Sequence, residues 1–144
     1  MASKIRVVIV DDIAETREHL AKLLSFESDI EVVGAASSGE EAVPLATKLQ
    51  PDVLLLDINM PGMDGIATAE QLSATLPLSA IVMMSVQGEP DYLRRSMLAG
   101  AREFLVKPFS ADELSAAIRQ VHKREQQKLG HMAANPTNGN GRPE

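Results

Sequence analysis

Short apolar runs that alternate with longer segments of helical spacing constrain this sequence more than any other feature. The runs cover Ile5–Val10, Ile30–Ala35, Val53–Leu56, Ala80–Met84 and Glu103–Val106. Three of them are nearly continuous Val, Ile, Leu and Met, as expected for strands of a parallel sheet that helices cover on both faces. Strands and helices that alternate along a chain form βα units. The sequence therefore predicts an α/β fold with five parallel strands and five helices.

Each segment of helical spacing begins with a residue that favours a helix start. These residues are Asp12, Ser38, Asp64, Pro90 and Ser110. The runs Asp12–Glu15 and Ser110–Glu113 have the pattern of a capping box, in which side chains bind free amides of the first turn. The first helix is expected to end near Phe26 and the fourth near Gly100. Pro44 lies inside the second helix and removes a backbone donor, so a kink or a later start is expected there.

The composition excludes several classes of function. The chain has 144 residues, of which 44% are hydrophobic and 24% are charged, as in ordinary globular domains. A formal charge of −6 argues against direct binding of nucleic acid through a basic face. No apolar run approaches the ~20 residues that span a bilayer, so membrane insertion is not expected. The absence of cysteine excludes thiolate catalysis and cysteine-ligated zinc, and it fits a cytoplasmic protein.

The sequence changes character near its carboxyl end. Residues 1–127 carry the alternating pattern, whereas the segment from Lys128, KLGHMAANPTNGNGRPE, is rich in Gly, Asn and Pro and has no periodicity. Such a composition is typical of linkers. We therefore expect one domain over residues 1–127 and a disordered tail or linker over residues 128–144.

Polar side chains follow four of the predicted strands at the point where each strand ends. Asp11 and Asp12 follow the first strand, Asp57 the third, Ser85 the fourth and Lys107 the fifth. Parallel strands end at the same edge of a sheet, where such folds bind their ligands, so these side chains are expected to meet. Crowded carboxylates raise one another's pKa, and a hard divalent cation such as Mg²⁺ removes that penalty.

Taken singly, each of these residues has an ordinary structural explanation. Asp12 could be a helix cap, and Lys107 could be a solvated surface side chain. Ser85 and Asp57 could belong to turns. Taken together, they supply the groups that phosphoryl transfer requires. A metal and an ammonium neutralise phosphoryl oxygens, a hydroxyl donates to another, and an aspartate accepts the group.

Four motifs contain these residues: VVIVDD at Val7–Asp12, LLLDINMPGMDG at Leu54–Gly65, MMS at Met83–Ser85 and FLVKPF at Phe104–Phe109. Together they resemble the CheY-like receiver domains of two-component response regulators, and the resemblance extends over residues 4–125. It implies a (βα)5 flavodoxin-like fold, doubly wound, with strand order 2-1-3-4-5. It also implies a signalling phosphoacceptor that is not an enzyme, beyond catalysing its own phosphoryl transfer and dephosphorylation.

The resemblance implies the following roles at the acidic site. Asp57 takes a phosphoryl group from a sensor histidine kinase or a phosphotransfer protein. Asp12 and Asp57 bind Mg²⁺ directly, Asp11 binds it largely through water, and Asn59 binds it through its main-chain carbonyl. Asn59 and Gln87 also occupy positions that influence the rate of dephosphorylation in this family, although their identities do not define a phosphoryl lifetime.

The resemblance further implies a conformational switch. Ser85 bonds to the phosphoryl group, Lys107 pairs with it, and Phe104 turns inward into the space that the serine loop vacates. Phe104 lacks the hydroxyl of the tyrosine that other receivers carry there. The peptide bond between Lys107 and Pro108 is expected to be cis, a form that is accessible only before proline.

The switch is expected to remodel the face formed by the fourth helix, the fifth strand and the fifth helix. This face would control a partner or a fused output domain, and it is a candidate homodimer surface. Its candidate partner-binding residues are Tyr92, Arg94, Arg95, Met97 and Arg102.

Alternative functions share parts of this pattern. Phosphatases of the haloacid-dehalogenase type also use an aspartate nucleophile and Mg²⁺. Their nucleophile belongs to a D-x-D motif on the first strand, whereas Asp57 follows the third strand. A docking receiver that does not use its phosphosite is also consistent with the motifs. A flavodoxin-like cofactor binder would share the fold, but aromatic residues are only 3% of the chain.

Two organisations of the output are open. The chain could be a stand-alone regulator, or the N-terminal piece of a longer protein whose linker begins in the tail. The runs DIAETR at Asp12–Arg17 and LLSFE at Leu23–Glu27 are similar to receivers fused to MinD-like pilus-assembly ATPases.

Overall fold

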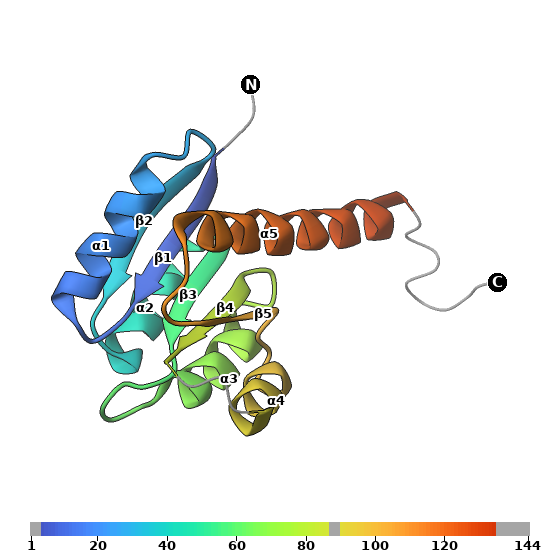
Figure 1. Cartoon of the computed structure of the whole chain (residues 1–144). Coiled ribbons are helices and arrows are strands. Elements are labelled where there is room, and N and C mark those ends of the chain that lie inside the picture. The colour runs from blue at the N-terminus through green and yellow to red at the C-terminus, as the bar shows by residue number, and fades with distance from the viewer. Residues whose placement is uncertain (1–3, 87–89, 135–144) are drawn as a thin grey trace.

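The computed structural model of the protein describes residues 4–86 and 90–134, with side chains as far as Lys128 (Figure 1). A five-stranded parallel sheet lies at its centre, in the order β2-β1-β3-β4-β5. The strands are β1 (Ile5–Val10), β2 (Ile30–Ala36), β3 (Val53–Asp57), β4 (Ala80–Ser85) and β5 (Glu103–Val106). This arrangement confirms the predicted α/β fold and the strand order 2-1-3-4-5.

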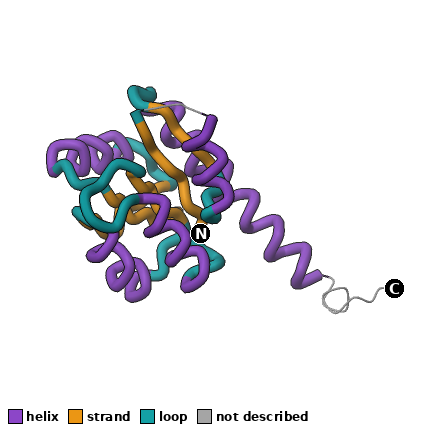
Figure 2. The backbone as a smooth tube through the Cα atoms, turned by 90° about the horizontal axis from the view of Figure 1, so that it is seen from below, coloured by secondary structure: helices purple, strands orange, loops and turns teal. Residues whose placement is uncertain are grey.

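Helices cover both faces of the sheet (Figure 2). The described residues form α1 (Ala14–Ser25), α2 (Gly39–Leu49), α3 (Gly65–Thr75), α4 (Pro90–Leu98) and α5 (Ala111–Ala134). Helices α1 and α5 pack on one face, and α2, α3 and α4 pack on the other. Within the described ranges, no helix is long and apolar enough to cross a bilayer.

The core explains why the central runs are continuously apolar. Leu54 and Leu56 belong to the layer beneath α2, α3 and α4, whereas Val53 and Leu55 belong to the layer beneath α1 and α5. All four side chains are completely buried. Successive residues of a strand point to opposite faces, so a strand covered on both faces has no position for a polar side chain.

Three predicted helix caps are confirmed. Ser38 Oγ accepts a hydrogen bond from the amide of Glu41 at 3.1 Å, and Asp64 Oδ1 accepts one from the first turn of α3 at 2.9 Å. Ser110 and Glu113 form the full capping box. The Glu113 amide donates to Ser110 Oγ at 3.0 Å, and the Ser110 amide donates to Glu113 Oε1 at 2.8 Å.

The predicted starts of α1 and α2 need correction. Helix α1 is preceded by Ile13, which makes no side-chain cap, so the capping box at Asp12 is wrong. The amide of Ile13 is instead bound by Asp11 Oδ1 at 2.9 Å. Helix α2 continues through Pro44, so a later start is also wrong. The Ser38 cap stabilises its first turn upstream of the proline.

Helix α5 is longer than the sequence predicted. It continues to Ala134, so residues 128–134 are helical rather than disordered. Most residues of that segment are Lys, Leu, Met or Ala, which favour a helix. Gly130 is its poorest helix former. Figure 1 shows the end of the helix projecting beyond the sheet. The rest of the predicted tail, residues 135–144, lies outside the described residues.

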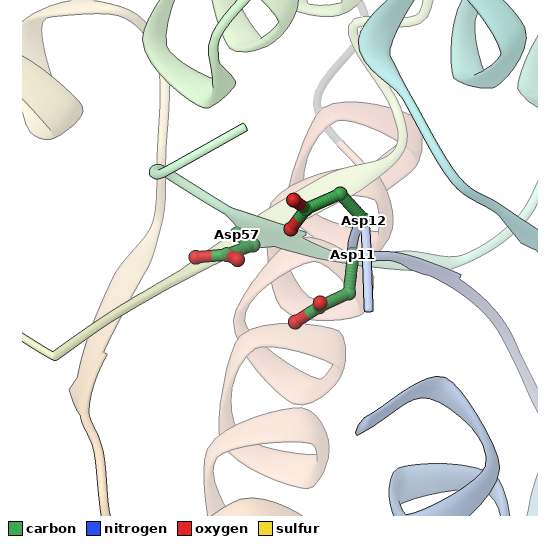
Figure 3. Close-up of side chains that lie close together, drawn as sticks. All are labelled: Asp11, Asp12 and Asp57. Atoms are coloured by element: carbon green, nitrogen blue, oxygen red, sulfur yellow. The ribbon is translucent and has the colours of Figure 1, made fainter. Parts of the chain in front are cut away.

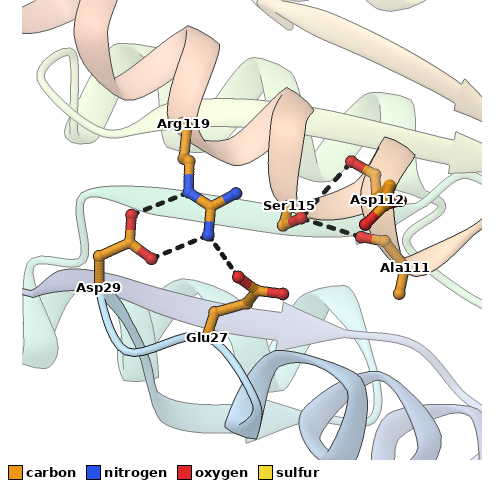
Figure 4. A network of polar contacts seen from close by, with 6 residues as sticks. All are labelled: Glu27, Asp29, Ala111, Asp112, Ser115 and Arg119. Carbon is orange, nitrogen blue, oxygen red and sulfur yellow. Dashed lines mark hydrogen bonds and ion pairs between the residues drawn. The ribbon is translucent and has the colours of Figure 1, made fainter.

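An arginine anchors α5 to the segment between α1 and β2 (Figure 4). Arg119 Nε donates to Asp29 Oδ2 at 2.8 Å and Arg119 Nη2 donates to Asp29 Oδ1 at 2.9 Å, while Nη2 also contacts Glu27 Oε1. The hydrogen bonds from Arg119 lower the pKa of Asp29 below its usual value. Such a two-pronged contact fixes orientation as well as distance. It therefore adds an orienting contact to the packing that holds α5 on the sheet, which involves the buried side chains of Leu114, Ile118 and Val121.

Leu55→Ala is expected to lower the free energy of unfolding by about 2–5 kcal/mol, because it leaves a cavity within a fully buried strand. Leu78→Ala is the matched control, since this side chain is 64% exposed, and it should change stability by less than about 0.5 kcal/mol. Urea unfolding followed by far-UV circular dichroism measures both variants. Equal losses in the two variants would contradict the central position of β3.

Candidate functional site

Three carboxylates converge at the edge of the sheet where β1 and β3 end (Figure 3). One carboxylate oxygen from each of Asp11, Asp12 and Asp57 lies within 4.8 Å of an oxygen from the other two. Asp11 and Asp57 are buried, whereas Asp12 is exposed. The topology therefore brings together the acidic residues that the sequence placed at separate strand ends.

Local hydrogen bonds orient Asp11. Its amide donates to Ala36 O at 3.1 Å, which extends the pairing of β1 with β2 by one residue. Its carboxylate accepts from the amide of Ile13, and its carbonyl accepts from Arg17 Nη1 at 2.8 Å. One oxygen, Oδ2, is left to face the site. The start of α1 thus holds Asp11 in place and leaves Asp12 at the surface.

Lys107 supplies the positive charge of the site. Its Nζ lies 3.2 Å from Asp11 Oδ2 and 3.8 Å from Asp57 Oδ2. The amide of Lys107 donates to the carbonyl of Ser85 at 2.7 Å, and the peptide bond to Pro108 is cis. The sequence predicted that Lys107 lies at the same edge of the sheet as Asp57, and the structure shows that its shorter contact is with Asp11.

The environment of Asp57 is unfavourable for a negative charge. Burial raises the pKa of its carboxyl from 3.8 to about 6. Repulsion by Asp11 and Asp12 acts in the same direction. The charge of Lys107 and the amide of Asn59, which lies 3.2 Å from Asp57 Oδ1, act in the opposite direction. The net cost of the buried charge, which comes mainly from desolvation, leaves a site that a cation would stabilise.

The donor set fits a hard divalent cation. It contains carboxylate oxygens from three residues, and such oxygen ligands are what Mg²⁺ prefers. Asp12 is exposed and therefore open to an arriving ion, while Asp57 is almost completely buried. Asn59, the other predicted ligand, is exposed two residues after Asp57.

The β3–α3 loop, residues 58–64, follows Asp57 and is closed at its base. The carbonyl of Ile58 accepts from the amides of both Met60, at 3.1 Å, and Gly65, at 3.0 Å. A Cβ atom at Gly65 would lie 2.2 Å from the carbonyl oxygen of Asp57. Only glycine therefore allows α3 to start so close to the end of β3. The sequence identified Asp64 as a helix start, but Gly65, which follows it directly, was not singled out.

Ser85 and Phe104 occupy neighbouring strands. Ser85 is the buried last residue of β4 and pairs in register with Val106. Phe104 pairs with Met83, is half-buried and packs against the core beneath α2, α3 and α4. Gln87, which was also singled out in the sequence, lies outside the described residues.

The predicted partner-surface residues divide into two groups. Arg94, Arg95 and Met97 are exposed on α4. Tyr92 is half-buried against the core. Arg102 is engaged within the domain, because its Nε contacts Glu125 Oε2 of α5 at 3.1 Å and its Nη1 donates to a carbonyl of the α4–β5 connection at 2.9 Å. Arg102 therefore joins β5 to α5.

A family model described as the response regulator receiver domain matches residues 7–119. The chain belongs to the response regulator receiver family. The protein is therefore a receiver of two-component signal transduction, a signalling protein. This membership leaves the haloacid-dehalogenase phosphatase and the flavin-binding alternatives without support.

Curated relatives are longer than this receiver. The transcriptional regulatory protein LiaR of Bacillus subtilis is 40% identical over 121 residues, which are 84% of this chain and 57% of LiaR. The response regulator protein VraR of Staphylococcus saprophyticus is 36% identical over 121 residues, which are 84% of this chain and 58% of VraR. The receiver thus spans little more than half the length of these relatives.

Solved receiver structures share the fold. The receiver domain of the putative response regulator NarL from Mycobacterium tuberculosis has a TM-score of 0.80 and 36% identity, and the match covers 85% of this chain and 98% of that one. A chain of the CheX-CheY-BeF3-Mg²⁺ complex from Borrelia burgdorferi has a TM-score of 0.78 and 28% identity, covering 83% and 90% of the two chains.

Asp57→Asn is expected to stabilise the receiver by about 2 kcal/mol at pH 7.5 when divalent cations are chelated. The folded-state pKa lies above the unfolded value, so the ionised carboxylate opposes folding at high pH, and this penalty disappears as pH falls through 6 toward 4. Urea unfolding across this pH range measures the difference from wild type, which should shrink toward zero. Asp112→Asn, at an exposed aspartate of α5, is the control. Destabilisation by Asp57→Asn at pH 7.5 would show that the ionised carboxylate of Asp57 does not oppose folding.

Proposed function

We propose that this receiver accepts a phosphoryl group on Asp57 from a sensor histidine kinase or a phosphotransfer protein. The observation that carries the proposal is the convergence of Asp11, Asp12 and Lys107 on the Asp57 carboxylate. A structural aspartate would be expected to gain more compensation than repulsion from its neighbours. Here burial and like charge outweigh the single lysine, which suits a group that is modified rather than one that stabilises the fold.

The Asp57 carboxylate acts as the nucleophile. A phosphorus–oxygen bond forms to one of its oxygens as the phosphorus–nitrogen bond of the donor phosphohistidine breaks. With a pKa of about 6, the carboxylate is mostly ionised at neutral pH and so retains the lone pair for attack. Lys107 Nζ, 3.8 Å from Asp57 Oδ2, can pair with the added phosphoryl oxygens. The same site would also lose the phosphoryl group to water, and Asn59, whose amide lies 3.2 Å from Asp57 Oδ1, is proposed to influence the rate of that loss.

Mg²⁺ is the proposed cofactor. The carboxylates of Asp12 and Asp57 and the main-chain carbonyl of Asn59 would hold it, and Asp11 would contribute through water. When bound, the ion supplies positive charge that neutralises the carboxylates and the phosphoryl oxygens. The cluster of carboxylate oxygens within 4.8 Å supports this assignment.

The proposed switch connects the phosphosite to β5. Phosphorylation adds about 1.5 to 2 negative charges and three acceptor oxygens. Ser85 would then move toward the phosphoryl group, and Phe104 would turn inward. The two residues lie on strands that pair directly, which supports coupling between them.

The α4-β5-α5 face is the proposed output surface. Besides Arg94, Arg95 and Met97, it exposes two apolar side chains that the sequence analysis did not single out, Leu93 of α4 and Val106 of β5. Mixed apolar and basic surface of this kind suits a protein partner or a second copy of the receiver.

We also propose that the receiver works in the cytoplasm and controls a fused output domain or a separate partner. Relatives in which the matched region is only 57–58% of the length support a fused output, and the name of one of them, a transcriptional regulatory protein, suggests gene regulation. A fused MinD-like pilus-assembly ATPase is the other prediction for the output. The sequence that follows Glu144 in the genome distinguishes these possibilities.

Incubation with acetyl phosphate and Mg²⁺ is expected to add one acid-stable but alkali-labile phosphoryl group to the wild-type protein, detected by intact mass. Asp57→Asn should abolish the addition, whereas the control Asp112→Asn should not change it. Chelation of Mg²⁺ should also abolish labelling. An unmodified wild-type protein under these conditions would refute the phosphoacceptor role and favour a docking receiver.

Ser85→Ala is expected to leave Asp57 open to labelling but to weaken the structural response. Amide hydrogen exchange in α4 and β5, compared with and without acetyl phosphate and Mg²⁺, measures that response. Ser85→Thr keeps the hydroxyl and should restore it. A full response in Ser85→Ala would show that the hydroxyl does not transmit the signal.

A further inference from the structure

The first turn of α2 contacts the β3–α3 loop from outside. Glu40 Oε2 accepts a hydrogen bond from the amide of Met63 at 3.1 Å. The neighbouring Glu41 has the local role usual at a helix start, since its Oε1 accepts from the amide of Ser37 at 2.6 Å and from Ser37 Oγ at 2.9 Å. Glu40 is therefore not needed to cap its own helix, and its carboxylate binds a distant segment instead.

Two glycines make room for this contact. Gly62 has a φ of 73°, a conformation that favours glycine, and a Cβ atom there would lie 2.9 Å from Glu40 Oε2. A Cβ atom at Gly39 would lie 2.9 Å from the carbonyl of Met63 and 2.1 Å from Thr68 Oγ1. The glycine at 39 thus allows the start of α2 to approach the backbone of the loop, and the glycine at 62 leaves room for the carboxylate of Glu40.

The contact completes the support of the loop. At the base, Ile58 O binds the amides of Met60 and Gly65, and the Met60 side chain is buried in the core. These interactions come from the loop itself, from the core and from the start of α3. Glu40 adds a hydrogen bond from α2 to Met63, in the second half of the loop and beyond the exposed Asn59.

We propose that Glu40 is a positioning residue of the phosphosite, which holds the β3–α3 loop so that the carbonyl of Asn59 faces the cation-binding carboxylates. This inference rests on the proposed function, because it assigns a role to the loop in Mg²⁺ binding and phosphoryl transfer. Glu40 holds the loop through the length of its side chain and the hydrogen bond that its carboxylate accepts, and not through its negative charge at the helix start.

Three variants of Glu40 separate the effect of side-chain length from the effect of charge. Glu40→Gln keeps the length and an acceptor oxygen but removes the charge. Glu40→Asp keeps the charge at the start of α2 but shortens the side chain by one methylene. Glu40→Ala removes both. Glu18→Ala, at an exposed glutamate of α1, is the control for loss of a surface charge.

Amide hydrogen exchange of ¹⁵N-labelled protein, without Mg²⁺ or phosphodonor, tests the contact itself. Exchange at Met63 is expected to accelerate by about fivefold or more in Glu40→Ala and Glu40→Asp, the effect of losing one hydrogen bond. Glu40→Gln and Glu18→Ala should match wild type. Core amides of β3 should not change in any variant, which separates loss of the tie from global destabilisation.

Binding of Mg²⁺ and labelling by acetyl phosphate test the role. The Mg²⁺ concentration that raises the thermal midpoint by half its maximal shift should increase about fivefold in Glu40→Ala and Glu40→Asp. The rate of labelling at a fixed, subsaturating Mg²⁺ concentration should fall in the same two variants and not in Glu40→Gln.

Several outcomes would overturn the inference. Unchanged exchange at Met63 in Glu40→Ala would show that the tie is absent, and impairment of Glu40→Gln with normal Glu40→Asp would assign the effect to charge. If Glu40→Ala is unfolded, the Gln and Asp pair decides between these results. Wild-type protein that resists labelling would refute the proposed function, whereas the exchange data would still decide whether Glu40 ties the loop.

Discussion

The buried carboxylate of Asp57 is the constraint on which the rest of this structure depends. It ends a strand whose other side chains are fully buried, and burial is the largest cause of its raised pKa. A lone carboxylate in that position would only destabilise the fold. In this fold the carboxylate is not isolated, because the parallel sheet places Asp11, Asp12 and Lys107 at the same edge. Burial and the neighbouring aspartates thus destabilise the negative charge of Asp57 and favour cation binding, whereas Lys107 partly stabilises that charge.

Close approach of backbone segments shapes the site as much as its charges do. Gly65 lets α3 start against the carbonyl of Asp57, and Gly39 and Gly62 let α2 lie against the β3–α3 loop. At Gly65 and Gly39 a Cβ atom would lie within 3 Å of a backbone carbonyl oxygen, so even a methyl group would displace the backbone. The loop that carries Asn59 is therefore supported by three elements, and its geometry depends on α2 and α3 as well as on the strand that ends in Asp57.

Two arginines bind the long last helix to the rest of the domain. Arg119 holds α5 to the segment that follows α1, and Arg102 holds it to the start of β5. Phe104 lies two residues after Arg102, within β5. In the proposed switch, a rearrangement of β5 would reach α5 through the contact of Arg102 with Glu125, which supports the proposal that the α4-β5-α5 face acts as one surface.

The sequence by itself determined the features that depend on local chemistry. Apolar runs and helix-start signals predicted the βα alternation, the caps at Ser38 and Ser110 and the strand ends that carry Asp57 and Ser85, because burial periodicity and capping involve residues close in the chain. Only the tertiary structure decided that Lys107 lies closer to Asp11 than to Asp57, that Ile13 and not Asp12 precedes α1, and that Glu40 reaches Met63. These contacts depend on distances between segments far apart in sequence, or on competition for one side chain between a local cap and a distant site. Local patterns do not contain that information.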